Sequence, residues 1–406
     1  MLDLDDRLDE LKQLGLYRRT RMVSGPQGPR VVLDGRPVLV LCSGNSLGLA
    51  DHPRVREAAA DAAMRWGVGA GAPRIGAGTM TLHRRLEERL ARFVGADATV
   101  LFGSGSLGNM GIIPALARKG EVVFHDELAH PSIADGCRLA GADTFAYRHV
   151  DPEHLAWGLA QSDGRGALVA TDGVFGLDGD VAPLEEIVEI ARHHDVRVLV
   201  DEAQSLGAVG PGGRGAVAEA GLEDEIDVIT GSLGKALGSY GGFACCDHVT
   251  ARYFVNSART LLHSTAPPPV AVAAAMASLV LLEEEPRRVE RLVSNAEGFR
   301  DALAREGFEV AGASTHIVPL LVGETEPATE IVEYALDQGV FVEAVLPPSV
   351  SDGAARLRLS VMASHTRAEL RGAAHVLARA ALRAGVRPGA GGPVALAQVE
   401  DLPRAA

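Results

Sequence analysis

Five short apolar segments recur through the first 235 residues, and they constrain the fold more than any other feature. They span 99–102, 121–125, 167–171, 196–201 and 228–231. Helical stretches of about 10–15 residues fit between them, and strands that alternate with helices build a mostly parallel sheet. Because both faces of such a sheet are covered, its strands are continuous apolar runs. The predicted fold class is therefore α/β with a mostly parallel central sheet.

The remaining sequence predicts four regions along the chain. Residues 1–50 are an N-terminal segment with an amphipathic helix, and residues 51–285 form a large domain that contains the sheet. Residues 286–384 form a smaller C-terminal α/β domain, with strands near 317–321 and 357–359. The tail 385–406 is rich in Gly, Pro, Ala and Arg, a composition typical of a flexible segment.

Composition excludes several classes of function. The formal net charge of −14 argues against a nucleic-acid or anionic-membrane partner, because phosphate neutralisation requires a basic surface. No apolar run reaches the roughly 20 residues of a membrane span, and the charged N-terminus lacks the apolar core of a signal peptide. The cysteines show no metal-binding spacing and are expected to be reduced: Cys42, Cys137, Cys245 and Cys246. We therefore expect a cytoplasmic enzyme without a metal ion.

Two residues indicate the chemistry. Lys235 lies in a small-residue loop, ITGSLGKALGSYGGF, and Asp201 ends the apolar run VRVLVD. A lysine is usually a solvated surface group, and an aspartate after a strand often caps a helix. Together, however, a buried lysine and a strand-end acid are what a chain requires to hold pyridoxal 5′-phosphate (PLP), with the lysine bonded to the aldehyde and the acid beside the ring nitrogen.

Polar groups near other strand ends extend this hypothesis. The Gly/Ser loop 102–109 lies between a strand and a helix, where free N–H groups bind phosphate, and Thr230, Ser232 and Thr265 offer hydroxyls. His130 follows a strand, and it is either a structural polar residue or a group at the site. In RLRLS (356–360) the arginines are either solvated on an edge strand, or one of them turns inward to bind a substrate carboxylate.

Four segments, in this order and spacing, resemble the α-oxoamine synthase family of fold-type I PLP-dependent enzymes. They are TDGVFGLDGDVAPL (171–184), VDEAQSLGAVGPGGRG (200–215), TGSLGKALGSYGG (230–242) and ARLRLSVMASHT (355–366). The resemblance extends over about residues 16–370. It implies an aspartate-aminotransferase-like fold with a seven-stranded sheet, PLP as the cofactor, and a homodimer whose active sites lie at the subunit interface.

The resemblance also implies a role for each matching residue. Lys235 would form the Schiff base, Asp201 would pair with the pyridinium, and His130 would stack on the ring and help to position the acyl thioester. The other implied cofactor-binding residues are Gly105, Ser106, Gln204, Thr230, Ser232 and, from the neighbouring subunit, Thr265. The implied substrate-binding residues are Arg18, Asn45, Ser349 and the carboxylate-binding Arg358.

The implied reaction is a decarboxylative Claisen condensation of an amino acid with an acyl-CoA or acyl-carrier-protein thioester. It yields an α-amino ketone, the free thiol and CO2. A different PLP reaction on the same fold, by an aminotransferase or a lyase, remains the alternative. Three departures from the family pattern favour a specialised biosynthetic role: Gln204 replaces a histidine, Gly176 a serine and Gly44 an asparagine.

Overall fold

The computed structural model describes residues 3–13, 16–310 and 314–386. Of the tail predicted for 385–406, residues 387–406 lie outside the described part. Among the described residues, no helix is both long and apolar enough to cross a membrane.

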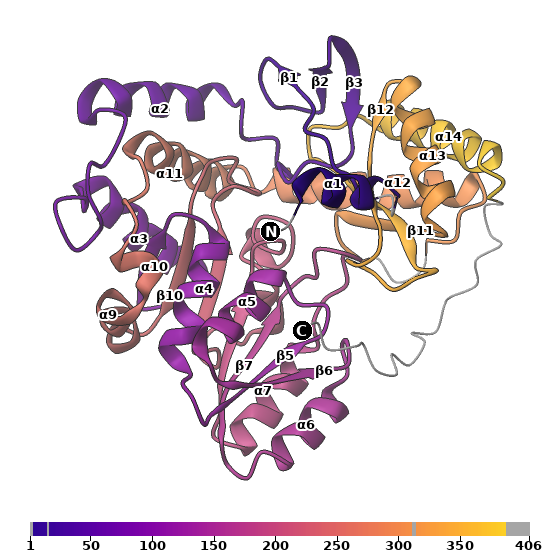
Figure 1. Ribbon diagram of the computed structural model, residues 1–406. Helices are drawn as coiled ribbons and strands as arrows, with labels where there is room; N and C mark the ends of the chain where they lie inside the picture. Colours follow the sequence, from indigo (N-terminus) through magenta and orange to yellow (C-terminus); the bar gives the residue numbers. More distant parts are fainter. Residues whose placement is uncertain (1–2, 14–15, 311–313, 387–406) are drawn as a thin grey trace.

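Residues 53–284, here called the large domain, are built around a seven-stranded sheet, and residues 287–383, here called the smaller domain, carry a separate sheet (Figure 1). The strand order of the seven-stranded sheet is β4-β10-β9-β8-β7-β5-β6. The bounds are β4 Ala98–Phe102, β5 Val122–Asp126, β6 Asp143–Tyr147, β7 Gly166–Asp172, β8 Arg197–Asp201, β9 Val228–Ser232 and β10 Gly242–Cys246. Strand β10 pairs antiparallel with both neighbours, whereas the other pairs are parallel. The predicted α/β class and mostly parallel sheet are therefore confirmed, and β6 and β10 are additions to the five predicted strands.

Helices cover both faces of this sheet, which explains its continuous apolar strands. The helices are α2 Pro53–Trp66, α3 Thr81–Val94, α4 Gly105–Leu116, α5 Pro131–Ala140, α6 Pro152–Ala160, α7 Leu184–His193, α8 Ala216–Ala220, α9 His248–Ser257, α10 Arg259–Leu262 and α11 Pro269–Glu284, with a short 3-10 turn, η1, at Pro211–Gly213. Alternate strand residues enter two different cores. Val100 packs with residues of α4, α5 and α9, whereas Leu101 packs with residues of α3, α7 and α11.

The smaller domain carries a three-stranded antiparallel sheet, ordered β11-β14-β13. Its elements are α12 Arg287–Arg305, β11 Ile317–Gly323, α13 Thr325–Asp337, β12 Val340–Phe341, β13 Glu343–Val345, β14 Ala355–Ser360 and α14 Arg367–Arg383. A capping box starts α14: the Thr366 hydroxyl accepts from the Glu369 N–H, while the Glu369 carboxylate accepts from the Thr366 N–H.

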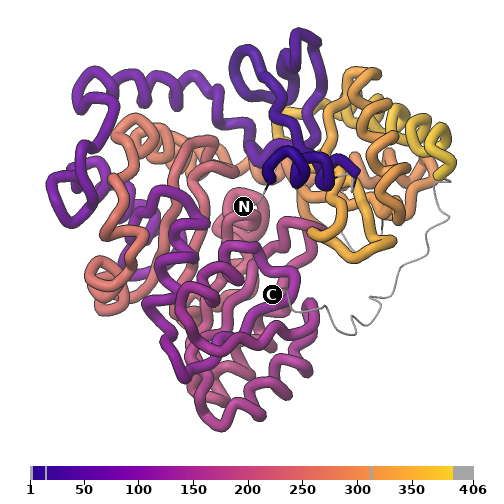
Figure 2. The backbone as a smooth tube through the Cα atoms, in the orientation of Figure 1, coloured from indigo at the N-terminus to yellow at the C-terminus, as the bar shows by residue number. Residues whose placement is uncertain are grey.

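The N-terminal segment joins the smaller domain. Helix α1 (Leu4–Gln13) is followed by strands β1 (Val23–Ser24), β2 (Arg30–Leu33) and β3 (Arg36–Val40). Strand β3 pairs in parallel with β12, so the beginning of the chain lies beside residues 340–341 (Figure 2). This pairing brings the loop that follows β3, residues 42–48, between the two domains.

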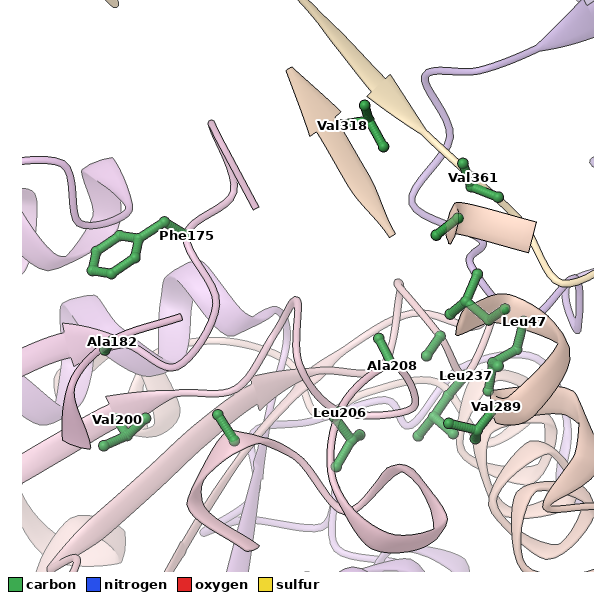
Figure 3. Close-up of a cluster of buried hydrophobic side chains, with 14 of the residues drawn as sticks. Leu47, Phe175, Ala182, Val200, Leu206, Ala208, Leu237, Val289, Val318 and Val361 are labelled. Carbon is green, nitrogen blue, oxygen red and sulfur yellow. The ribbon is translucent and has the colours of Figure 1, made fainter. Parts of the chain in front are cut away.

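One apolar core runs continuously from the large sheet into the smaller domain. It includes Val200 of β8, Leu237 of the lysine loop, Leu47 after β3, and Val318 and Val361 of the smaller domain (Figure 3). Burial of this shared surface holds the domains together, and it fixes the loops that meet above the carboxyl ends of the strands.

Candidate active site

Lys235 follows β9 in a loop held down by two fully buried leucines, Leu233 and Leu237. Its side chain is half-buried and makes no hydrogen bond or ion pair among the described residues. Burial lowers the pKa of the amine, and the nearby positive charge of Arg358 lowers it further, while Asp201 opposes this change. A lysine with a lowered pKa is more often neutral, and the neutral amine is the nucleophile that attacks an aldehyde.

The loop after β3 lies directly against this lysine. A β-carbon at Gly44 would lie 2.8 Å from Cδ and 3.5 Å from Nζ of Lys235. The adjacent Asn45 is buried, and its amide oxygen accepts from the N–H of Ala50 at 3.2 Å. Its Nδ2 group is buried without a partner among the described residues. The predicted substrate-binding residue Asn45 therefore belongs to the segment that packs against Lys235.

Asp201 lies at the end of β8 in a buried hydrogen-bond network. Its Oδ2 accepts from Nδ2 of Asn109 at 2.7 Å, and its Oδ1 accepts from the N–H of Ala203 at 2.8 Å. Asn109 also donates to the hydroxyl of Ser132 at 2.9 Å and accepts from the hydroxyl of Thr230 at 2.8 Å. The predicted Thr230 thus supports Asp201 through Asn109. A carboxylate fixed in this way can hold a proton on a pyridine nitrogen.

Sequence reasoning missed Asn109, although one signal was present. Helix α4 is otherwise apolar or small (GSLGNMGIIPAL), and Asn109 is its only amide. A fully buried amide in such a helix requires partners within the core, because an unsatisfied polar group is costly there.

Asp172, also missed, is the register partner of Asp201 on the neighbouring strand β7. It is buried, and its Oδ2 accepts from the backbone N–H of His130 at 2.7 Å. Burial raises the pKa of Asp172 well above its ordinary value, and the negative charge of Asp201 raises it further. Two adjacent buried carboxyl groups cannot both ionise easily, and the raised pKa of Asp172 favours its protonated form.

His130 caps the start of helix α5. Its Nδ1 accepts from the N–H of Ser132 at 3.2 Å and lies 2.7 Å from the Ser132 hydroxyl. The residue is exposed, and the hydrogen bonds to Ser132 fix the orientation of its ring. An imidazole held at one edge with its face accessible is suited to stacking on a flat aromatic ring.

The start of helix α4 meets the end of β9. Ser104 caps the helix by accepting from the N–H of Leu107 at 3.1 Å, and Gly105 and Ser106 follow as its first residues. A β-carbon at Gly105 would lie 3.2 Å from the carbonyl oxygen of Gly231 and 3.6 Å from Cβ of Ser232. The glycine therefore allows the helix N–H groups and the Ser232 hydroxyl to lie together, as an anion site requires.

Arg358 lies on β14, and burial lowers the pKa of its guanidinium. Its Nε donates to the carbonyl of Gly176, and one terminal nitrogen, Nη1, donates to the Ser360 hydroxyl at 3.1 Å. A β-carbon at Gly176 would lie 3.2 Å from Nε2 of Gln204. Two of the three departures from the family pattern, Gly176 and Gln204, are thus in contact with each other, and Gly176 also contacts Arg358.

A third unpredicted group faces this end of the site. His316 is buried at the start of β11, and its Nδ1 has no partner among the described residues. Burial lowers the pKa of His316 to about 3, and the positive charges of Arg358 and Lys235 contribute to the same direction. The imidazole is therefore neutral where it lies near the Arg358 guanidinium and the Lys235 amine.

Three predicted residues are not brought into this cluster by hydrogen bonds. Arg18 and Ser349 are exposed, and Thr265 is exposed where it bridges to Pro73 of the glycine-rich segment. The predicted role of Thr265 in a neighbouring subunit stays a prediction. No group of three or more His, Cys, Asp or Glu is arranged to hold a metal ion in the part of the chain that the structure describes.

These residues fit PLP. The half-buried amine of Lys235, the carboxyl group of Asp201 and the anion site at Gly105 and Ser232 would supply partners for the aldehyde, the ring nitrogen and the phosphate, respectively. The observation that decides the fit is the missing β-carbon at Gly105, because a side chain there would crowd the contact between the helix start and the Gly231 carbonyl at the end of β9.

Comparisons with known proteins agree with this site. The family described as aminotransferase class I and II matches residues 36–377. An 8-amino-7-oxononanoate synthase from Geobacter sulfurreducens is 44% identical over 382 residues, which cover 93% of this chain and 98% of that protein.

Two solved structures are also similar. The serine palmitoyltransferase of Sphingomonas wittichii superposes with a TM-score of 0.91 at 28% identity, covering 95% of this chain and 100% of that chain. A serine palmitoyltransferase from S. paucimobilis with a bound PLP–myriocin aldimine gives a TM-score of 0.89 at 31% identity, covering 94% and 97%. The chain therefore belongs to the class I and II aminotransferase family, as a PLP-dependent enzyme of the α-oxoamine synthase group.

Proposed function

We propose that this enzyme condenses an amino acid with an acyl thioester and releases CO2 and the free thiol, to give an α-amino ketone. One observation carries the proposal. The half-buried, unpaired amine of Lys235 lies in the electrostatic range of two groups, the carboxylate of Asp201 and the guanidinium of Arg358. The first suits a pyridinium and the second suits the carboxylate of an amino acid. The relatives named 8-amino-7-oxononanoate synthase and serine palmitoyltransferase support this reaction class.

Each residue has a physical task in this reaction. Bound PLP supplies an electron sink for negative charge at the substrate α-carbon. Arg358 binds the substrate carboxylate by paired N–H donors and so orients the α-carbon toward Lys235. Nζ of Lys235 removes the α-proton, a task that its lowered pKa favours because the neutral amine is the base.

The remaining groups hold charge and exclude water. Asp201 keeps a proton on the ring nitrogen, and Asn109 holds that carboxylate in place. Gln204 offers an amide N–H to the cofactor 3′-oxygen but cannot carry charge, unlike the histidine that the family commonly has there. His130, oriented by Ser132, would stack on the cofactor ring and help to position the thioester. The shared apolar core around Leu47 and Leu237 keeps the base of the site dry.

The assembly and location that we propose follow the same reasoning. The enzyme acts as a homodimer in the cytoplasm, and Thr265 of one subunit serves the site of the other. Sedimentation at micromolar concentration tests the dimer. The PLP affinity of a Thr265→Ala variant tests the role of Thr265. An unchanged PLP affinity in that variant would remove Thr265 from the site.

A matrix of common amino acids against acyl-CoA thioesters of increasing chain length tests the reaction. We expect thiol and CO2 in equal amounts, and a product whose mass is that of the amino ketone, for at least one pair. Lys235→Ala should lose both the visible absorbance of lysine-bound PLP and turnover. Keto acid formation without thiol release would instead favour an aminotransferase, and repeating the matrix with acyl-carrier-protein thioesters identifies the donor.

A further inference from the structure

Residues 173–182, here called the bridging hairpin, follow β7 and connect the two domains. The hairpin closes on itself through an antiparallel bridge between Val174 and Val181. The N–H of Phe175 donates to the carbonyl of Asp180 at 2.9 Å, and the N–H of Gly179 donates back to Phe175 at 3.0 Å. Phe175 and Ala182 are buried in the shared core, so the base of the hairpin belongs to the large domain (Figure 3).

The base is anchored by a buried histidine. His149, beyond the end of β6, lies 2.9 Å from Oδ1 of Asp126 through Nδ1 and 2.7 Å from Oδ2 of Asp180 through Nε2. Its ring also packs edge-on against Phe175 at a centroid distance of 4.5 Å. Burial alone would lower the pKa of His149, but the two carboxylates raise it to about 10. The imidazolium therefore donates to a carboxylate on each side and ties the hairpin to the end of β5.

The tip of the hairpin forms hydrogen bonds with the smaller domain. Asp178 accepts from Nη1 of Arg356 at 2.6 Å, and the carbonyl of Gly179 accepts from the Thr315 hydroxyl at 2.7 Å. Gly179 has a φ of +76°, and a β-carbon there would lie 2.5 Å from the carbonyl oxygen of Ile317. Only glycine permits this approach, so the hairpin tip and strand β11 are held in direct contact.

The same strand face carries the proposed carboxylate-binding arginine. Arg356 and Arg358 are two residues apart on β14, so their side chains leave the strand on one side. Arg356 is fixed by Asp178, and Arg358 is fixed by the carbonyl of Gly176. Three consecutive residues of the hairpin therefore span the two contacts with β14. The remaining terminal nitrogen of Arg358, Nη2, makes no hydrogen bond to the described residues and stays available to a ligand.

We propose that the bridging hairpin is a positioning element that sets the direction in which Arg358 presents its guanidinium to the substrate carboxylate. Asp178 and Arg356 are its key pair, and neither of them touches the substrate. The inference rests on the proposed function, because it requires Arg358 to bind the carboxylate of an amino acid. It adds that affinity for the amino acid depends on an ion pair outside the site.

The test uses PLP-loaded enzyme and the amino acid selected by the reaction matrix. Its dissociation constant is measured from the change in visible absorbance on titration, and the dissociation constant of PLP is measured separately. Asp178→Asn and Arg356→Met should each weaken amino-acid binding about threefold to tenfold, as expected for loss of one partly buried ion pair. PLP affinity should stay within about twofold, because the cofactor contacts lie on other strands. Asp143→Asn, which breaks the exposed pair with Arg165 on the far end of the sheet, is the matched control and should change neither constant.

Double variants separate positioning from general destabilisation. Arg358→Met should weaken amino-acid binding about a hundredfold, and adding Asp178→Asn should then have no further effect, because the pair acts only through Arg358. Additive losses of binding in the double variant would overturn the inference. So would unchanged amino-acid binding in Asp178→Asn and Arg356→Met when Arg358→Met binds weakly. Both results would leave the proposed function intact. If Arg358→Met binds the amino acid as tightly as the unaltered enzyme, both the carboxylate-binding role of Arg358 in the proposed function and the positioning role of the hairpin are wrong.

Discussion

Asn109→Ala is the substitution whose cost follows most directly from the structure. The Asn109 side chain makes three hydrogen bonds, to the charged Asp201 and to the neutral hydroxyls of Ser132 and Thr230. A buried neutral hydrogen bond contributes about 1 kcal/mol and one to a charged group about 1.5–3 kcal/mol. Because the three partners are buried and each loses one hydrogen bond, we expect the unfolding free energy to fall by about 3–5 kcal/mol.

Urea unfolding of the variant and of the unaltered protein measures this loss, and a PLP titration measures the effect on Asp201. PLP binding should weaken, because Asp201 loses the donor that orients its carboxylate toward the ring nitrogen. Asn256→Ala is the control: Asn256 is exposed, its amide donates only to the Arg252 carbonyl at 2.7 Å, and its loss should cost no more than about 0.5 kcal/mol. A loss below about 1 kcal/mol at Asn109, with unchanged PLP affinity, would refute the assignment of Asn109 as the support of Asp201.

Three further predictions address the ring, the phosphate end and the hairpin anchor. Gln204→His should shift the pH midpoint of the visible absorbance of lysine-bound PLP while turnover persists, and an unchanged titration would show that residue 204 is not near the ring. Gly105→Ala should weaken PLP binding at least about tenfold, since its β-carbon would lie 3.2 Å from the Gly231 carbonyl; normal affinity would remove the helix start from the phosphate site. The pKa of His149 is raised from 6.5 to about 10, so the stability that it confers is full below pH 6.5 and is lost as the pH rises toward 10. Unfolding free energy should fall by up to about 5 kcal/mol over this range, and Asp180→Asn, which removes one acceptor, should flatten the slope; an equal slope in both proteins would contradict the assignment.

Local patterns predicted much of the large domain. Each of the five apolar segments became a strand within one or two residues of its predicted bounds, for example 228–231 as Val228–Ser232. Strands β6 and β10 were not predicted from their sequences. Strand β6 is an edge strand whose residues are largely exposed, so it shows no simple apolar signal. Strand β10 (GFACC) is fully buried and apolar after its first glycine, and it was missed because it begins within the glycine-rich segment that carries Lys235. Strand β10 pairs antiparallel with β9, the strand just before it in the chain, and with β4, which is distant in sequence.

The residues of the candidate active site were also only partly predictable from the sequence. Lys235 and Asp201 were predictable as a pair, because a lysine in a small-residue loop together with an acid at a strand end is what PLP binding requires. Asn109 and Asp172 were not, because their importance lies in partners that only the sheet brings near: Asn109 reaches Asp201 across 92 residues. Their polarity alone does not distinguish them from ordinary surface groups.

The sequence by itself determined the parallel α/β sheet, the anchoring lysine and its acid partner, since alternation of apolar runs and local residue chemistry are short-range properties. Only the tertiary structure decided that burial beside Asp201 raises the pKa of Asp172, and how a hairpin holds Arg358 through the carbonyl of a residue 182 positions earlier. Charge state and direction depend on burial and on neighbours from other elements, and these exist only after the chain has folded.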